Sequence, residues 1–521
     1  MPDRLLEAYE NVPYESKPIR LSHISSIEVI ARLHGLTPPP SDRCRVLELG
    51  CASGANVVTM AASLPNSEFV GIDLVPSQIA AGQETIEALG LRNISLHAMS
   101  LVDVTRDFGT FDYIVCHGVY SWVPPEVQDA ILRICSENLS PTGIAYISYN
   151  IYPGWHIRGM AREMMSYHDK AFLPPAERIA RARSFIETIA GAANSGSAHG
   201  VALAREVEVL RGQGDVYLLH EQLEPFNAPV YFAEFARRAG AKGLRYVAEA
   251  KMASSGTEVP AWMNQVLDGD SDDVVRIEQY LDFARGGTFR RTLLCHDTMV
   301  PSRNPDAAKI RDFHIVMRAV PVKPSDEDAR RSDGKAESFK SADDVVVTTN
   351  NPMVIAALRA LLRAMPGALS FTELARRVDE RLRVDLPPGF SDDGVNLHQG
   401  LEEAMLQCAA GGLVELLRHE SPLSATVSER PVAFPLARHR AATGEVVPNL
   451  RHYAVETSGL ERLILMHLDG TNTRDGLLEI TERAILEGTL TTGDERPNRN
   501  QLAAAIDAAL HRFALAAVLE A

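Results

Sequence analysis

A run of small residues beside one carboxylate is the first part of the sequence whose residue types suggest chemistry. Residues 48–54 read Glu-Leu-Gly-Cys-Ala-Ser-Gly, directly after an apolar run and before a segment with helical spacing. A turn of this kind between a buried strand and a helix lets the backbone approach a ligand closely, because only small side chains stand in the way. The small residues that would line this approach are Gly50, Cys51, Ala52 and Gly54.

The carboxylate of Glu48 indicates which ligand fits this turn. Many nucleotide cofactors would present a pyrophosphate here, and a carboxylate just before the first glycine would repel it. The amino group and the sulfonium of S-adenosylmethionine (SAM) are positively charged and tolerate the same carboxylate. We therefore predict that the loop binds the methionine end of SAM, with a plain strand-to-helix turn as the alternative.

A second carboxylate, Asp73, ends the next apolar run, about 20 residues beyond the glycine loop. An acidic side chain at that distance is placed to accept hydrogen bonds from both ribose hydroxyls. Met99 could pack on the adenine ring or belong to the core, and Ser100 would bond an edge nitrogen. Further cofactor contacts are expected at the ends of the second, third and fourth runs, from Leu74, Met99, Ser100 and Cys116.

Aromatic and polar side chains follow the fourth and fifth apolar runs. Residues 117–125 read His-Gly-Val-Tyr-Ser-Trp-Val-Pro-Pro and residues 149–156 read Tyr-Asn-Ile-Tyr-Pro-Gly-Trp-His, so two of the three tryptophans fall in these segments. Ligands of parallel sheets bind outside the carboxyl ends of the strands, which places both segments beside the methyl acceptor. The predicted acceptor site comprises His117, Trp122, Tyr149, Asn150 and Trp155.

The chemistry of methyl transfer explains why aromatic residues suit this position. The reaction needs a neutral nucleophile in line with the methyl group and little more from the protein. Aromatic walls desolvate a lysine ammonium, which lowers its pKa, and hold methylated products by cation–π contacts. We therefore expect a protein substrate that presents lysines. Two alternatives stay open: the aromatic residues only cap the sheet edge, and His117 is either a base or a hydrogen-bonding residue.

The elements that must position these residues alternate along the chain. Short apolar runs at residues 45–49, 68–73, 94–98, 111–116 and 143–149 are separated by helical patterns. This alternation predicts an α/β fold with a doubly wound, mostly parallel sheet, Rossmann-like in class. Residues 243–249 and 288–295 also look like strands and could complete the same sheet, which would make the helical stretch at about 157–240 an insertion.

The length of 521 residues exceeds what one hydrophobic core normally supports, so several domains are expected. We expect a SAM-binding domain over residues 1–300, a middle domain over 301–425 and a C-terminal helical domain over 426–521. The middle domain would carry a charged linker at about 323–344, which is rich in charge and turn formers. The regions beyond the sheet are expected to be mainly α-helical.

Bulk properties exclude several classes of protein. The net charge of −16 argues against nucleic acid as a partner, because the chain as a whole repels phosphate backbones. The six cysteines show no spacing typical of zinc, so no metal is expected. No window approaches the roughly 18 apolar residues of a membrane helix, and no signal-peptide pattern is present. These observations predict a cytoplasmic protein without membrane insertion.

Several segments together resemble a known family. They are residues 9–18 (YENVPYESKP), 47–54, 116–124 (CHGVYSWVP), 149–155 (YNIYPGW) and 220–227 (HEQLEPFN). They resemble bacterial class I methyltransferases with a methyltransferase regulatory domain, a group that includes rickettsial lysine methyltransferases acting on outer-membrane proteins. The resemblance implies that an N-terminal segment with Tyr14 and His23 folds over SAM. It also implies that the later domains help in substrate capture or in forming a homodimer.

Two other functions stay open at this point. One is a small-molecule methyltransferase whose later domains only dimerise. The other is a SAM-binding regulator without catalysis. The long region beyond the catalytic sheet favours a large substrate over a metabolite, and the acceptor segments argue against a pure sensor.

Overall fold

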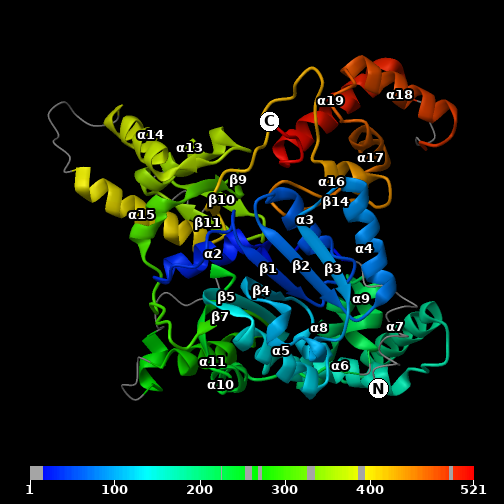
Figure 1. Ribbon diagram of the computed structural model, residues 1–521, viewed down its shortest axis with the longest axis vertical. Coiled ribbons are helices and arrows are strands. Elements are labelled where there is room, and N and C mark those ends of the chain that lie inside the picture. The colour runs from blue at the N-terminus through cyan, green and yellow to red at the C-terminus, as the bar shows by residue number, and fades with distance from the viewer. Residues whose placement is uncertain are drawn as a thin grey trace.

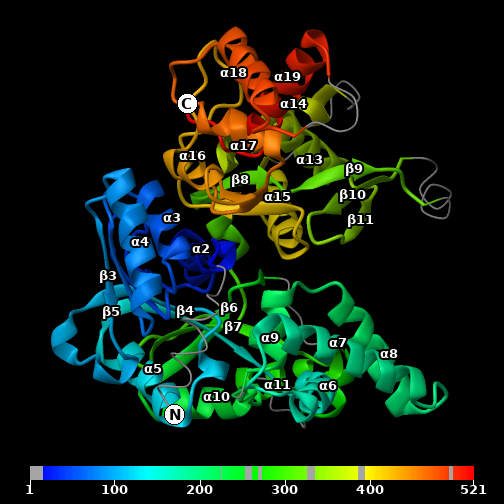
Figure 2. The same ribbon diagram turned by 90° about the vertical axis from the view of Figure 1, so that its right-hand side faces the viewer.

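The computed structural model describes residues 16–224, 226–252, 261–267, 273–325, 335–384, 394–491 and 497–521. Tyr14, which the resemblance places over the cofactor, lies outside these residues. The described chain forms a central sheet with flanking helices and a helical insertion, then a mixed middle domain, then a mainly helical C-terminal domain (Figures 1 and 2).

A seven-stranded sheet forms the centre of the N-terminal part (Figure 1). In spatial order its strands are β3 (Ile94–Ala98), β2 (Glu68–Asp73), β1 (Arg45–Leu49), β4 (Phe111–Cys116), β5 (Leu139–Asn150), β7 (Phe289–His296) and β6 (Leu244–Glu249). Strands β1 to β5 are parallel, and β7 runs antiparallel to both of its neighbours. The predicted doubly wound fold is confirmed. The strand order reverses between β1 and β4, so their carboxyl ends border the crevice where such sheets bind ligands.

Helices cover both faces of the sheet, because alternate residues of each strand point to opposite sides. Val46 packs in the core formed with α2 (Ile24–Leu33), α3 (Ala55–Ser63) and α4 (Pro76–Leu89). Its neighbour Leu47 packs in the core formed with α5 (Pro125–Glu137) and α10 (Phe232–Gly240). Burial on both faces explains why the strands read as continuous apolar runs.

Four helices between β5 and α10 form a small core of their own. They are α6 (Gly154–His168), α7 (Pro175–Ala192), α8 (Ala198–Arg211) and α9 (Asp215–Gln222). Met165, Ile186 and Leu203 are buried in this core. Since α6 begins almost directly after β5, the insertion adjoins the carboxyl edge of the sheet, near α11 (Val274–Arg285; Figure 2).

The middle domain contains small sheets as well as helices. Its helices are α13 (Pro352–Ala364), α14 (Phe371–Val384) and α15 (Gly394–Ala410). One sheet contains β9 (Ala319–Val322), β10 (Glu337–Ser341) and β11 (Val346–Thr349), and the other β8 (His314–Met317), β12 (Leu369–Ser370) and β13 (Val414–Leu417). The expected linker is wrong over its second half, because β10 pairs with both β9 and β11 and buries Phe339 in the domain core. The prediction of a linker rested on the charged and turn-forming residues of this segment, and these do not reveal the strand.

Helix α2 belongs to two cores at once. Ile27 and Ile30 pack under the central sheet, whereas Val29 and Leu33 pack in the core of the middle domain. The sheet and the middle domain are therefore joined through one helix.

The C-terminal domain rests directly on the helices that follow β1 and β2 (Figure 1). It contains α16 (Pro435–Ala441), α17 (Gly459–Met466), α18 (Arg474–Leu486), α19 (Arg499–Leu515) and the antiparallel pair β14 (Val446–Pro448) and β15 (Ala454–Glu456). Val58 of α3 is part of its core, and Ile86 and Leu89 of α4 pack against it. Within the described ranges, no helix combines the length and the apolar character that a membrane crossing requires.

Candidate active site

The loop after β1 has the geometry of a ligand-binding turn. Gly50 and Gly54 have φ of +72° and +74°, and a Cβ on Gly50 would lie 2.4 Å from Cγ2 of Val119. Position 50 therefore requires glycine both for its backbone angle and for the close approach of the segment that follows β4. Ala52 also has a positive φ, of +49°. The N–H groups of Gly50 and Cys51 donate to the carbonyl of Ile72, which fastens the loop to the end of β2.

Asp73 holds this loop from the neighbouring strand. Its Oδ2 accepts from the N–H of Ala52 at 2.8 Å, and its Oδ1 accepts from the N–H of Val75 at 3.0 Å. Burial raises the pKa of Asp73, and the backbone donors partly oppose this shift. A carboxylate has about four acceptor positions, so the two N–H bonds leave capacity for the hydroxyls of a ribose.

Glu48 is buried beneath the same loop, with 4% of its surface exposed. Its Oε1 accepts from Nδ2 of Asn56 at 2.6 Å, and the backbone N–H of Val57 also lowers the pKa of this carboxyl, whereas Oε2 is buried without a hydrogen bond of normal geometry among the described residues. Burial raises the pKa of Glu48 to about 7. A buried carboxylate oxygen without a donor is costly unless a cation meets it. The residues present therefore fit the positively charged end of SAM.

The remaining cofactor candidates take different positions. Leu74 is exposed, and Met99 and Ser100 are half-buried, at the carboxyl ends of β2 and β3. Cys116 is fully buried in the core beneath the sheet, so its backbone alone can border a ligand. The ring of His23 accepts from the N–H of Ser25 at 3.2 Å, and its centroid lies 4.9 Å from that of His452. His23 is thus engaged with the C-terminal domain.

His117 follows β4 and turns back onto β5. Its Nδ1 lies 2.8 Å from the hydroxyl of Tyr146. Burial, with a smaller contribution from the cations of Arg291 and Lys17, lowers the pKa of His117 to about 3. An imidazole with this pKa is neutral near pH 7 and a poor proton acceptor. Of the two alternatives for His117, the structure favours the hydrogen-bonding residue.

Trp122 and Trp155 meet between the ends of β4 and β5. Their rings are T-shaped with centroids 6.3 Å apart, and both side chains are buried. The backbone N–H of Trp155 donates to the backbone carbonyl of Ile151, which anchors this tryptophan to the end of β5. Its indole Nε1 is buried without a hydrogen-bond partner in the described part of the chain.

Asn150, the last residue of β5, is held by two segments distant in sequence. Its backbone N–H donates to Oγ of Ser121 at 2.8 Å, and its side-chain Nδ2 donates to Oδ1 of Asn227 at 3.1 Å. Because Asn227 engages the amide nitrogen, the amide oxygen of Asn150 is turned away from Asn227. Ser121 precedes Trp122, so the same hydrogen bond ties Trp122 to the strand end.

Tyr149 and Asn150 are neighbours in β5, so their side chains point to opposite faces of the sheet. Its ring stacks on Phe235 of α10 with centroids 4.0 Å apart, and its hydroxyl lies 2.9 Å from Oγ1 of Thr292. The side chain is 1% exposed. The structure therefore brings His117, Trp122, Asn150 and Trp155 to one edge of the sheet and encloses Tyr149 in the core.

Sequence reasoning missed the residues that hold the others in place. Asn56, Ser121 and Asn227 each bond a predicted site residue. Asn227 lies in the segment 220–227 that carries the family resemblance, so a signal for it existed. Asn56 lies at the start of an otherwise apolar helix. The sign in the sequence was a polar residue among apolar ones at that position.

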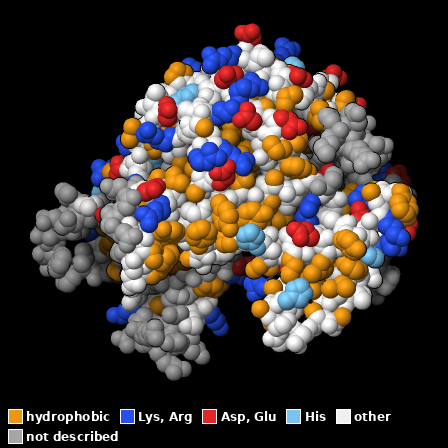
Figure 3. Space-filling model, turned by 90° about the horizontal axis from the view of Figure 1, so that it is seen from below, with side chains coloured by type: hydrophobic (Ala, Val, Ile, Leu, Met, Phe, Trp, Pro, Cys, Tyr) orange, Lys and Arg blue, Asp and Glu red, His pale blue; other side chains and the backbone are white. Residues whose placement is uncertain are grey.

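An aromatic row begins at the acceptor segment with the half-buried Tyr152 and continues through the exposed His156, Tyr231 and Phe283. Successive ring centroids lie 4.2, 6.2 and 5.9 Å apart. Phe283 is 50% exposed. Tyr152 directly precedes α6, His156 lies in α6, Tyr231 directly precedes α10, and Phe283 lies in α11. The side of the molecule on which these helices lie carries many apolar side chains (Figure 3).

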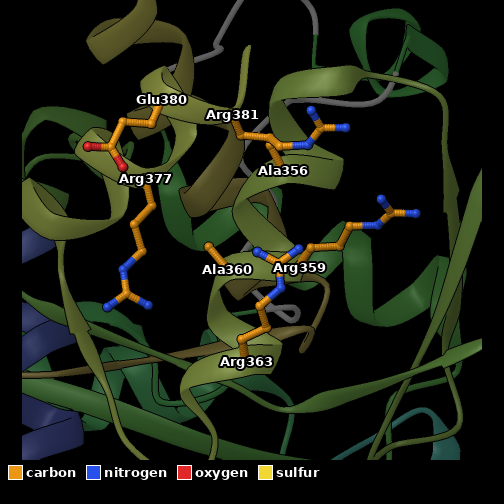
Figure 4. A pocket seen from close by; sticks show the side chains of 7 residues that line it. All are labelled: Ala356, Arg359, Ala360, Arg363, Arg377, Glu380 and Arg381. Carbon is orange, nitrogen blue, oxygen red and sulfur yellow. The ribbon is translucent and has the colours of Figure 1, made fainter. Parts of the chain in front are cut away.

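A separate cleft of about 280 Å³ lies between α13 and α14 in the middle domain (Figure 4). It is lined by Arg359, Arg363, Arg377, Arg381, Glu380 and two alanines. Glu337 pairs with Arg359, and Glu373 pairs with Arg377. No lining residue comes from the central sheet, so this cleft is not part of the candidate active site.

Three known families match successive parts of the chain. Residues 47–145 match the family described as a methyltransferase domain, and residues 214–296 a predicted methyltransferase regulatory domain. Residues 429–518 match the C-terminal winged helix domain of PKMT. The middle domain lies between the second and the third of these matches.

Individual relatives extend the similarity to nearly the whole chain. An uncharacterized protein of Rickettsia prowazekii is 33% identical over 494 residues, which cover 94% of this chain and 88% of the relative. A second uncharacterized protein of that organism is 38% identical and covers 46% of this chain and 96% of its own. The structure of PKMT2 from Rickettsia typhi in complex with AdoHcy has a TM-score of 0.85 at 27% identity and covers 97% of this chain and 100% of its own.

The fold, the glycine loop and these similarities agree on the cofactor and the reaction class. AdoHcy is what remains of SAM after the methyl group has left, and a solved relative of the same architecture binds it. The chain belongs to the bacterial family of SAM-dependent class I methyltransferases that carry a methyltransferase regulatory domain, together with these rickettsial proteins.

Proposed function

We propose that the protein transfers methyl groups from SAM to lysine side chains of a protein substrate. The observation that carries this proposal is the amide of Asn150, oriented by Asn227 at the end of β5. Trp122 and Trp155 are anchored to the same strand end. A carbonyl oxygen at the same strand end as two buried tryptophans is suited to accept a hydrogen bond from an amine that must lose its charge and be held in one orientation.

On the cofactor side, each predicted residue receives one part of SAM. Glu48 would meet the ammonium group through its free Oε2, and Asp73 would accept from the ribose hydroxyls. Gly50, Cys51, Ala52 and Gly54 would let the backbone approach the methionine end. Leu74, Met99 and Ser100 would border the adenine. SAM, when bound, supplies a methyl group on a positively charged sulfur.

On the acceptor side, the site must favour the neutral amine. The tryptophan rings exclude water, which disfavours the ammonium form and lowers its pKa. The amide oxygen of Asn150 accepts from an amine N–H, which directs the nitrogen lone pair toward the methyl carbon. With SAM bound, the amine nitrogen would take the methyl group as the sulfur becomes neutral, and the methylated product would leave the site as an ammonium and lose its proton in solvent. His117 is neutral and adds no positive charge, and Tyr149 supports the wall from the core.

Two observations favour a protein over a small molecule as the acceptor. The aromatic row continues from the acceptor segment to the surface of α11, which would suit the side chains that flank a lysine. The similarity to PKMT2 extends over 97% of the chain, beyond what cofactor binding requires.

The test is to incubate the protein with methyl-tritiated SAM and a fractionated bacterial lysate. We expect label in protein bands, and methylated lysine after acid hydrolysis of those bands. Label in metabolites alone would establish a small-molecule methyltransferase instead. SAM binding without any transfer would establish a regulator. Asn304, an exposed asparagine away from the site, serves as the matched control: Asn304→Ala should keep the labelling that Asn150→Ala loses.

A further inference from the structure

A buried hydrogen-bond network connects the cofactor loop with the C-terminal domain, and Asn56 is its centre. Asn56 lies in the first turn of α3 and is 4% exposed. Its Nδ2 donates to Oε1 of Glu48 at 2.6 Å and to Oγ of Ser22 at 3.0 Å. Its Oδ1 accepts from the N–H of Ile19 at 2.9 Å and lies 2.7 Å from Nε2 of His452.

His452 reaches this network from the turn between β14 and β15. It is separated from Asn56 by 396 positions in sequence and is 2% exposed. Burial lowers the pKa of His452 well below its ordinary value, so the ring is neutral and has one N–H to donate. The oxygen of Asn56 needs a donor, so that N–H is on Nε2. The backbone of His452 is held in the left-handed region, at φ +63°.

The orientation of the Asn56 amide determines what Glu48 encounters. A carboxylate requires the amide nitrogen, and the opposite orientation would place two oxygens face to face in a buried site. The donors from Ile19 and His452 fix the oxygen of Asn56 on the far side. Only then does Nδ2 bond Oε1 of Glu48 and leave Oε2 for a ligand.

We infer that His452 is a positioning residue for SAM binding, acting through Asn56 on Glu48. This inference rests on the proposed role of Glu48 at the ammonium group of SAM. It makes the winged helix domain part of the support of the cofactor site. The N-terminal part alone would lack His452, which is the single member that the C-terminal domain contributes.

A neighbouring link across the same junction provides a control. Tyr453 donates its hydroxyl to Oε2 of Glu415 at 3.1 Å, and Glu415 also pairs with Arg20. The guanidinium of Arg318 lies 3.9 Å from the centre of the Tyr453 ring. Tyr453→Phe removes one hydrogen bond at this junction and leaves the bonds of Asn56 intact.

The experiment compares His452→Ala, His452→Gln and Tyr453→Phe in the full-length protein, with the Kd of SAM measured by calorimetry. We expect His452→Ala to raise the Kd about tenfold, the size expected for losing a hydrogen bond that supports a charged group. His452→Gln keeps an N–H donor and should recover most of the affinity. Alanine and glutamine carry the same backbone strain at φ +63°, so the difference between them reports the side chain. Tyr453→Phe should lower the Tm without changing the Kd.

A double-mutant cycle separates this inference from the role of Glu48. If Glu48→Gln leaves the Kd unchanged, the proposed cofactor contact is wrong. If Glu48→Gln weakens binding but His452→Ala does not, only the positioning role is wrong. The expected result is that His452→Ala has its tenfold effect in the native background and almost none when Glu48→Gln is present. Equal effects in both backgrounds would indicate a general loss of folding and overturn the inference.

Discussion

The two halves of the active site are built in different ways. The glycine loop and both carboxylates of the cofactor half lie within residues 48–74, and their geometry comes largely from backbone angles. The acceptor half brings together the ends of β4 and β5 with Asn227 from a segment that follows the helical insertion. The cofactor loop itself is a local structure, although Asn56 links its Glu48 to the distant His452, whereas the acceptor half exists only when distant segments pack.

This difference shows which changes each half tolerates. A Cβ at position 50 would meet Val119 at 2.4 Å, so one added carbon there should weaken SAM binding strongly. The acceptor half depends on side-chain orientation, so a substitution there should slow transfer and leave SAM affinity unchanged. The following substitutions and conditions test this separation.

The largest effect is expected for Gly50→Ala. The new Cβ would lie 2.4 Å from Val119 at φ +72°, so the loop must shift. Strain and overpacking of this kind correspond to a loss of SAM affinity of about 100-fold or more. Calorimetric titration with SAM measures it. Gly90→Ala is the matched control, since Gly90 has φ +63° with nothing within 4 Å, and it should keep normal affinity.

Asn150→Ala should act only on the acceptor half. Loss of the oriented amide misplaces the amine, and we expect turnover to fall about 50-fold with the Kd of SAM unchanged. Single-turnover labelling of the protein substrate, together with a SAM titration, separates the two quantities. A parallel loss of SAM affinity would show that the two halves are not separate.

The pH dependence of SAM binding reports on Glu48. With the pKa of Glu48 raised to about 7, its carboxylate is mostly protonated at pH 6 and mostly ionised at pH 8. The Kd should therefore fall about tenfold from pH 6 to pH 8, one unit on each side of this pKa. Without SAM, the free energy of unfolding should change in the opposite direction and fall as the pH rises. Folding raises the pKa of the Glu48 carboxyl, so its contribution to stability is lost as the pH rises through about 7. In Glu48→Gln both dependences should disappear.

The smallest effect is expected for Tyr149→Phe. Among the described residues its hydroxyl bonds Thr292 alone, so the free energy of unfolding should fall by about 1 kcal/mol. Turnover should change less than twofold. Chemical denaturation and steady-state labelling measure the two. A large loss of turnover would return Tyr149 to the acceptor site, as the sequence suggested.

The cofactor half was predictable because its signals are local. Glu48, Gly50 and Asp73 are separated by fixed distances that strand and loop lengths impose, and the parallel sheet follows from the apolar runs. Tyr149 was placed at the acceptor as part of the aromatic segment 149–156, although adjacent strand residues such as Tyr149 and Asn150 face opposite sides. The contacts of Asn56 with His452 and of Asn150 with Asn227 depend on tertiary packing, which no spacing encodes.

Helix α2 has a consequence for how the protein is synthesised. Its residues leave the ribosome early, whereas Leu361 and Leu401, which lie in the same core as Val29 and Leu33, are translated much later. Growing chains fold from the N-terminus as they emerge. During that interval one apolar face of α2 is open to water. Translation arrested before α15 should therefore yield chains that chaperones hold, even though every strand of the central sheet has already been made.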